Sequence, residues 1–212
     1  MKGQTQALTT ILITTVTIGA IASAYVWGTP LLEKRQDKAE IDQLERSVFE
    51  LNDEVRSVSS GGSGKSSRVT LSISNGEIMI NEDRDYIQIT TDAQDSPYPE
   101  IWSLVRGKTR QNLSIGSGDY ALYGSDEPVV LAAKDSGSSG SLTQIMYRIE
   151  TRNMKRGDSN LNKIDLKSVG RTKSNGETTL ILTNRGTETD SNVNIDGKTM
   201  QRTRTVVEVD LQ

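Results

Sequence analysis

The first residues of the chain, MKGQTQALTTILITTVTIGAIASAYVWGTPLLEK (1–34), decide how the rest of the sequence is interpreted. No charged residue occurs from Gly3 to Leu32, although charged residues make up 25% of the chain. A helix of roughly 20 apolar residues is long enough to cross a bilayer. Tyr25 and Trp27 stand near the far end, where aromatic side chains favour a membrane interface. We therefore predict an apolar membrane or filament-core helix over residues 4–32.

A secretory signal peptide is the first alternative, because Ala22-Ser23-Ala24 fits the small-residue rule for cleavage. Against it, the charged leader is a single lysine and the apolar run continues through Leu31 and Leu32. We therefore interpret the helix as part of the finished protein. Pro30 lacks a backbone N–H, so it is expected to kink the helix or to end its first section.

Residues 33–58 change to an amphipathic pattern in which apolar residues recur at spacings of three and four. This places one narrow apolar stripe on a helix with charged residues on its other faces. Two and a half heptads are marginal as an isolated coiled coil, so the stripe is expected to pack against something larger, with a short parallel coiled coil as the alternative. The stripe consists of Ile41, Leu44, Val48, Leu51, Val55 and Val58.

The remaining sequence predicts a glycine- and serine-rich linker at 59–67 followed by a β-rich domain at 68–212. Many short strand patterns separated by glycine, with no convincing long helix, favour a sandwich or an open barrel. Asn75-Gly76, Asn175-Gly176 and Asp196-Gly197 are expected to form two-residue hairpin turns. The predicted fold class is α+β: a long N-terminal helix followed by a sandwich-like all-β domain.

The composition argues against catalysis. The chain has no cysteine and no histidine, which removes thiol nucleophiles, the commonest general base and the commonest zinc ligand. The net charge is −3, so the basic surface that nucleic acid requires is not expected. We predict no catalytic, cofactor-binding or metal-binding residues, no cofactor and no small-molecule substrate.

The apolar helix carries two adjacent strips of small residues spaced four apart. Small side chains let helix backbones approach closely inside a membrane, where lipid offers no hydrophobic drive for association. We therefore predict that helices of this kind associate with one another. The first strip is Thr15, Gly19 and Ser23, and the second is Ala20, Ala24 and Gly28.

With these features, residues 1–58 resemble archaeal type IV pilins, archaellins and pseudopilin-like proteins, a family with class III signal peptides. Lys2-Gly3 followed by Gln4 is similar to their leader, although Gln6 and Leu8 stand where some archaeal pilins have serine and glutamate. The resemblance implies that a prepilin peptidase cleaves between Gly3 and Gln4 and removes residues 1–3. It also implies a subunit that is first anchored in the membrane and then self-associates into a helical filament.

The function expected from this resemblance is a structural role in an archaeal pilus-like or archaellum-like surface filament for adhesion or motility. The precursor of such a subunit resides in the cell membrane, and the mature subunit is part of an extracellular filament on the cell surface. The alternative is a single-pass anchored binding, stator or minor pseudopilin protein that stays in the membrane.

Asn112, in Asn112-Leu113-Ser114, is a possible glycosylation site.

Overall fold

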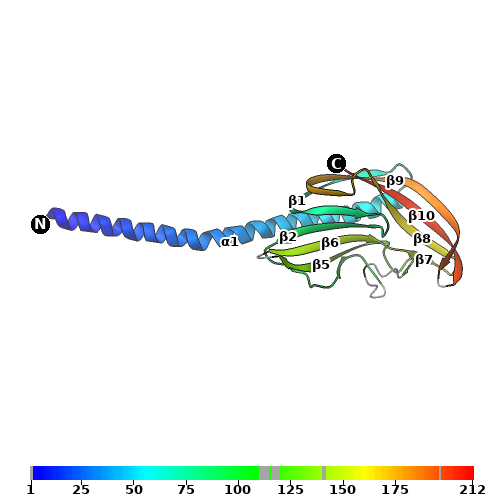
Figure 1. The fold of residues 1–212 in the computed structure, drawn as a ribbon, viewed down its shortest axis with the longest axis horizontal. Coiled ribbons are helices and arrows are strands. Elements are labelled where there is room, and N and C mark those ends of the chain that lie inside the picture. The colour runs from blue at the N-terminus through cyan, green and yellow to red at the C-terminus, as the bar shows by residue number, and fades with distance from the viewer. Residues whose placement is uncertain (1, 110–114, 116–119, 140–141, 196) are drawn as a thin grey trace. The chain divides into compact units, whose positions relative to one another are not determined.

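The structure is a computed structural model that describes residues 2–109, 115, 120–139, 142–195 and 197–212. One helix, α1 (Lys2–Ser60), precedes all the strands (Figure 1). The strands are β1 (Ser66–Asn81), β2 (Tyr86–Ala93), β3 (Ser103–Arg106), β4 (Ala121–Leu122), β5 (Val129–Ser139), β6 (Leu142–Thr151), β7 (Met154–Arg156), β8 (Asn160–Val169), β9 (Lys173–Ile195) and β10 (Lys198–Leu211).

The chain forms two compact units, residues 1–41 and residues 42–212. The first unit is helical throughout its described part, residues 2–41. The second contains the last part of α1 and every strand. The boundary falls within the charged section of α1 and not at the glycine- and serine-rich segment, so residues 42–60 of the helix belong to the β-rich unit.

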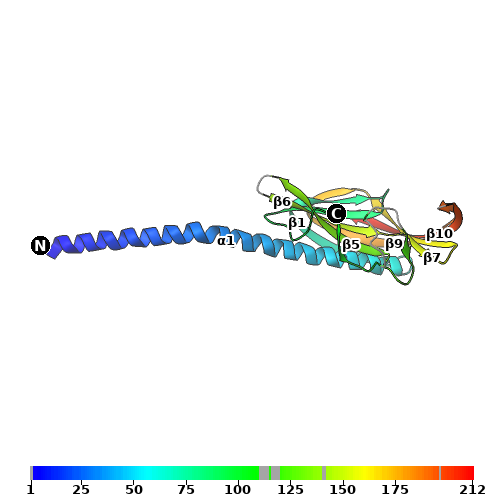
Figure 2. The same cartoon turned by 90° about the horizontal axis from the view of Figure 1, so that it is seen from below.

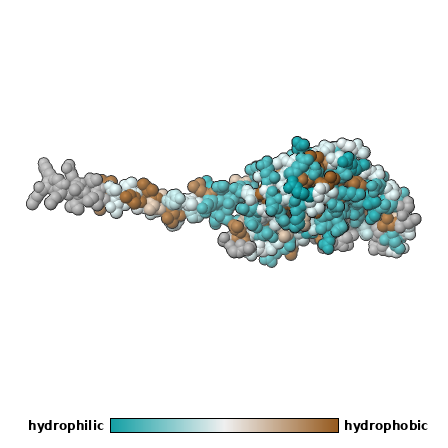
Figure 3. Space-filling view, turned by 45° about the horizontal axis from the view of Figure 1, so that its top comes forward, coloured by the Kyte–Doolittle hydropathy of each residue, from teal (hydrophilic) through white to brown (hydrophobic). Residues whose placement is uncertain are grey.

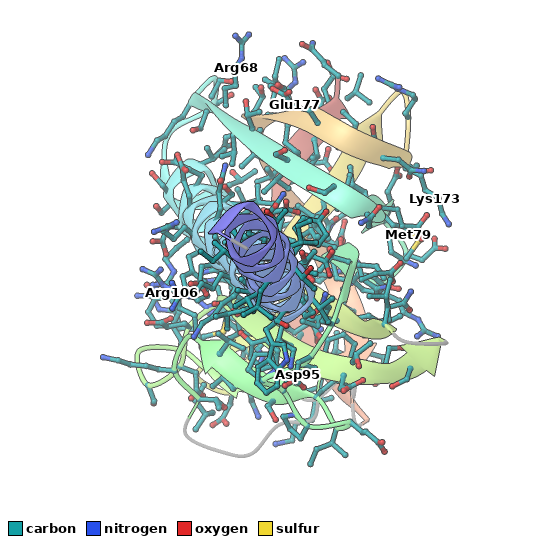
Figure 4. All side chains as sticks on the ribbon, turned by 90° about the vertical axis from the view of Figure 1, so that its left-hand side faces the viewer. Arg68, Met79, Asp95, Arg106, Lys173 and Glu177 are labelled. Atoms are coloured by element: carbon teal, nitrogen blue, oxygen red, sulfur yellow. The ribbon has the colours of Figure 1, made fainter. Side chains whose placement is uncertain are left out.

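The ten strands of the described residues belong to one sheet with the order β3-β5-β6-β2-β1-β9-β10-β8-β7-β4. Most neighbouring strands are antiparallel, but β8 pairs with β10, and β4 with β7, in parallel. The α+β class is thus confirmed. The sandwich is not, because the strands form a single hydrogen-bonded sheet. This sheet curves around residues 42–60 of α1 in the views of Figures 2 and 4.

The curvature explains why one predicted hairpin is wrong. Asn75-Gly76 lies inside β1, and neither residue has the positive φ that the predicted turn requires. Residues 66–73 of β1 pair with β9 and residues 76–81 pair with β2, with a register shift between Ile73 and Glu77. A Cβ atom on Gly76 would lie 1.9 Å from the backbone oxygen of Thr90. Glycine is needed here for close strand approach and not for a turn.

The other two hairpin predictions have opposite outcomes. Asn175-Gly176 lies inside β9, where Gly176 has φ 77° and stands opposite Ile73 at the same register shift, so that prediction is also wrong. The pairing of β9 with β10 in a hairpin is confirmed, because Lys198 pairs with Ile195 and Met200 with Val193, while Asp196 lies outside the described residues. A dipeptide that favours left-handed backbone thus marks a bulge in one place and a turn in another.

The core lies between α1 and the concave face of the sheet. Leu44, Val48, Leu51, Val55 and Val58 of the helix are buried, and Ile41 at the unit boundary is half-buried. The larger partner of the amphipathic stripe is therefore the chain's own sheet. The sheet contributes fully buried residues from its central strands, among them Leu71, Ile73, Ile78, Ile87, Ile89, Leu131, Tyr147, Ile149, Leu180 and Leu182.

Candidate assembly interface

The section of α1 between Leu12 and Leu32 exposes apolar side chains along its length. Trp27 is 85% exposed, and even the least exposed of the large apolar residues, Leu31, is 56% exposed. Brown apolar atoms gather on this part of the helix in Figure 3, whereas the visible face of the β-rich unit is mostly hydrophilic. Contiguous exposed apolar surface of this extent marks a site of contact with lipid or with protein.

One helix among the described residues is long and apolar enough to cross a membrane. Its apolar section near the N-terminus is the sequence-predicted segment, and none of that section is buried within the chain. By length and composition, α1 is therefore a candidate membrane span.

Both strips of small residues lie on this helix. The space beside Gly19 and Gly28 is open, with no other atom within 4 Å of the position that a Cβ would take. A neighbouring helix can therefore approach the backbone closely there. Thr15, Ser23, Ala20 and Ala24 lie on the same exposed section of the helix.

The hydroxyl groups of Thr17 and Ser23 donate hydrogen bonds to backbone carbonyls of the same helix. Ser23 Oγ donates to the carbonyl of Gly19 at 2.8 Å, and Thr17 Oγ1 donates to Ile13 at the same distance. A polar group that has an internal partner costs little when it enters lipid or a helix interface. Threonine and serine here are thus compatible with an apolar environment.

Pro30 does not end the helix, since α1 continues to Ser60. It cannot donate to the carbonyl of Val26, one turn before it. Thr29 Oγ1 donates to the adjacent carbonyl of Tyr25 at 2.8 Å. The helix therefore passes through a proline at the aromatic end of the apolar section.

The residues of the predicted leader cleavage, Gly3 and Gln4, lie in the first turn of α1. The predicted glycosylation site, Asn112, lies outside the described residues.

The glycine- and serine-rich segment at 59–67 is fastened to the β-rich unit. Asn184 Nδ2 donates to the carbonyls of Val58 and Gly61, both at 2.9 Å, and so caps the end of the helix. Lys65 Nζ donates to the carbonyl of Ser57 at 2.7 Å, and Gly64 N donates to the carbonyl of Asn184 at the same distance. The segment is a tight connection between α1 and β1.

A tyrosine–glutamate cluster, which we did not predict, holds the start of the packed helix section. Both Tyr98 and Tyr147 donate their hydroxyl groups to Glu45 Oε1, the latter at 3.1 Å. Their rings meet edge to face, with centroids 5.7 Å apart. Burial raises the pKa of both hydroxyls, and the Glu45 carboxylate raises it further. These residues lie far apart in the sequence, so no local pattern could have identified them.

Among the described residues, no group of three or more carboxylate side chains is placed to hold a metal ion. The conspicuous acidic residues on β8 and β9, Asp165, Glu188 and Asp190, are paired with Arg204.

No protein-family model matches the chain, and neither the curated proteins nor the solved structures contain a match to it.

Proposed function

We propose that this chain is a structural subunit of a surface filament of the archaeal type IV pilus or archaellum kind, assembled through the apolar helix of residues 4–32. The observation that carries the proposal is the contrast within one helix. The stripe from Leu44 to Val58 is buried against the chain's own sheet, whereas the apolar residues from Leu12 to Leu32 remain exposed.

The free energy of apolar burial explains why this contrast matters. Fully burying a large apolar side chain is worth roughly 1.5–3 kcal/mol. The exposed section of α1 carries ten such side chains: Leu12, Ile13, Val16, Ile18, Ile21, Tyr25, Val26, Trp27, Leu31 and Leu32. A segment of this kind requires an apolar environment. Lipid supplies it for the precursor, and the helices of neighbouring copies supply it in the filament.

The β-rich unit fits the exterior of such a filament. Its core is completed by residues 44–58 of its own helix, so it does not need a second copy to bury that core. The face seen in Figure 3 is largely hydrophilic, which suits contact with water. Filament formation thus requires only the N-terminal section, and adhesion or motility follows from assembly.

The leader fits the same scheme. A prepilin peptidase would cut between Gly3 and Gln4, leaving Gln4 as the first residue of the mature subunit. The precursor would reside in the cell membrane, and the mature subunit would be part of an extracellular filament.

Surface filaments sheared from cells that express the chain provide the test. Peptide mass spectrometry should find the chain in the filaments with Gln4 at its N-terminus. Electron cryomicroscopy should show a core of α-helices surrounded by β-rich units. A chain that is confined to membranes and retains Met1 would refute the proposal and support the anchored binding or stator protein.

Cross-linking adds a local test, because the sequence contains no cysteine. A Gly19→Cys variant should form disulfide-linked dimers on oxidation of intact filaments. Ser72→Cys, on the exposed face of β1, is the matched control and should remain monomeric. Equal cross-linking at both positions would contradict a specific helix contact.

A further inference from the structure

The turn between β1 and β2 places a buried carboxylate against β8. Asp85 is 3% exposed and has φ 52°, an uncommon left-handed conformation for a residue other than glycine. Its carbonyl oxygen accepts a hydrogen bond from Thr151 N at 3.0 Å. Its carboxylate oxygen Oδ1 accepts one from Leu166 N at 2.9 Å. Asp85 is thus held through its backbone carbonyl and through its side chain.

The other carboxylate oxygen of Asp85 contacts an amine. Lys163 Nζ is ion-paired with Asp85 Oδ2. The Lys163 side chain is 21% exposed, so this amine lies largely out of water. Asp85 lies in the turn between β1 and β2, and β9 and β10 separate β1 from β8, the strand that carries Lys163.

A second carboxylate lies beside the same amine. Asp165 is on the same face of β8, two residues from Lys163, and its Oδ1 is 3.2 Å from Lys163 Nζ. Arg204 Nη1 holds the other oxygen, Oδ2, at 2.8 Å. Asp165 is therefore oriented with one oxygen toward the pair formed by Lys163 and Asp85.

The electrostatic environment favours a neutral carboxyl group at Asp85. Burial raises the pKa of Asp85, and the hydrogen bonds from Lys163 and Leu166 offset only part of that rise. Burial acts to lower the pKa of Lys163, but Asp85 and Asp165 outweigh it and raise that pKa. Transfer of the shared proton from Lys163 Nζ to Asp85 Oδ2 within the ion pair leaves a neutral amine beside a protonated carboxyl group, and Asp165 is placed to accept the next proton, which the nitrogen loses during attack.

We propose that Lys163 and Asp85 are joined by an intramolecular amide bond formed without any other reactant. The neutral amine of Lys163 attacks Cγ of the protonated Asp85 carboxyl group, forming an N–C bond. The Leu166 N–H stabilises the negative charge that develops on Oδ1. Asp165 accepts the proton from the attacking nitrogen and returns it to the Oδ2 hydroxyl, which leaves as water. No oxidation or reduction occurs.

This bond would link the β1–β2 turn covalently to β8. Thr151 Oγ1, on β6, lies 3.1 Å from the carbonyl oxygen of Asp85 and 2.8 Å from that of Ile164 on β8. Hydrogen bonds already join the β1–β2 turn to β6 and β8 here. A covalent link at this place resists separation of the strands. The link lies within the β-rich unit, so its formation does not depend on filament assembly.

The intact mass of the denatured full chain is the direct test. The chain should be produced in a host without a prepilin peptidase, so that residues 1–3 are retained. The expected mass is lower than that of the sequence by one water molecule. Trypsin should release residues 85–106 covalently joined to 157–167, because an amide at Lys163 prevents cleavage after it. A full sequence mass with the two peptides separate would overturn the proposal without any variant.

Two variants separate the amide from the ion pair. Lys163→Arg keeps the positive charge beside Asp85 but cannot form the amide, so its mass should equal its own sequence mass. Asp165→Asn keeps both reacting groups and should slow formation at least tenfold when the intact mass of each newly made chain is followed over time after cell-free synthesis, because denaturant does not reopen an amide that has already formed. Loss of water in Lys163→Arg would refute the assignment of the amine. An unchanged rate in Asp165→Asn would refute the role of Asp165.

Discussion

The burial of α1 against the sheet leads to a sharp prediction for Leu51. This residue is fully buried, one turn from the equally buried Val48 and Val55. Leu51→Ala removes side-chain atoms between a helix and a sheet that are fixed by many other contacts, so the site has little freedom to collapse. A matched control is available on the same helix in Leu31→Ala, where the side chain is 56% exposed.

The expected magnitude follows from the full burial of Leu51. Leucine-to-alanine substitutions in a core cost about 2–5 kcal/mol, through lost transfer free energy and the cavity left behind. In a unit of this size each kcal/mol lowers the melting temperature by about 2–4 °C. Leu51→Ala should therefore lower the melting temperature of the β-rich unit by roughly 10 °C. The Leu31→Ala control should leave it within about 2 °C, because surface substitutions change stability by about 0.5 kcal/mol or less.

Tryptophan fluorescence of the full chain in detergent micelles provides the assay. The chain has two tryptophans, and a Trp27→Phe background leaves Trp102 as the reporter. Arg148 Cζ lies 4.3 Å and Lys134 Nζ 5.3 Å from the centroid of the Trp102 ring. The emission of Trp102 should therefore change when the sheet unfolds and these contacts are lost. If Leu51→Ala and Leu31→Ala have equal melting temperatures, the packing of α1 on the sheet is refuted.

Three further variants, one of them with two substitutions, test separate parts of the structure. Gly76→Ala places a Cβ 1.9 Å from a backbone oxygen of β2 and should destabilise the unit by about 3 kcal/mol or more in urea unfolding; a smaller effect contradicts the close strand approach. The free energy of unfolding should fall as pH rises above 10.0, the ordinary pKa of tyrosine. Tyr98 and Tyr147 have raised pKa values in the folded state, so they stay protonated there while the same residues ionise in the unfolded chain. A double Phe variant should have a flatter alkaline unfolding profile, and an unchanged profile excludes the tyrosine–glutamate cluster as its cause. Gly19→Leu should abolish filaments seen by electron microscopy and leave the melting temperature unchanged; normal filaments contradict close helix packing.

Local periodicity was sufficient for much of the fold. The spacing of Leu44, Val48, Leu51, Val55 and Val58 predicted a helix with one buried face, and the structure buries these residues. The predicted β-rich character of the chain after the helix is also confirmed, because alternation of apolar and polar residues reflects the two faces of a strand. The hairpin of β9 and β10 is correct because its turn joins strands that are adjacent in sequence.

The same local signals could not separate a turn from a bulge. Asn75-Gly76 and Asn175-Gly176 have the composition of hairpin turns, yet both lie within long strands at the register shift between β1 and β9. What distinguishes them is the approach of other strands, such as the backbone of Thr90 beside Gly76. That contact depends on how the sheet curves, and the dipeptide carries no information about it.

The apolar N-terminal helix, the amphipathic stripe and the β-rich composition could all be predicted, because each depends on residues that are near neighbours in the chain. The assembly of the strands into one sheet curved around residues 42–60 of the helix could not, and neither could the contact of Glu45 with Tyr98 and Tyr147. The tertiary structure also brought Asp85, Lys163 and Asp165 together. The physical reason is that contacts between distant segments are fixed by the packing of the whole unit, whereas helix and strand patterns are fixed by the local repeat of the backbone.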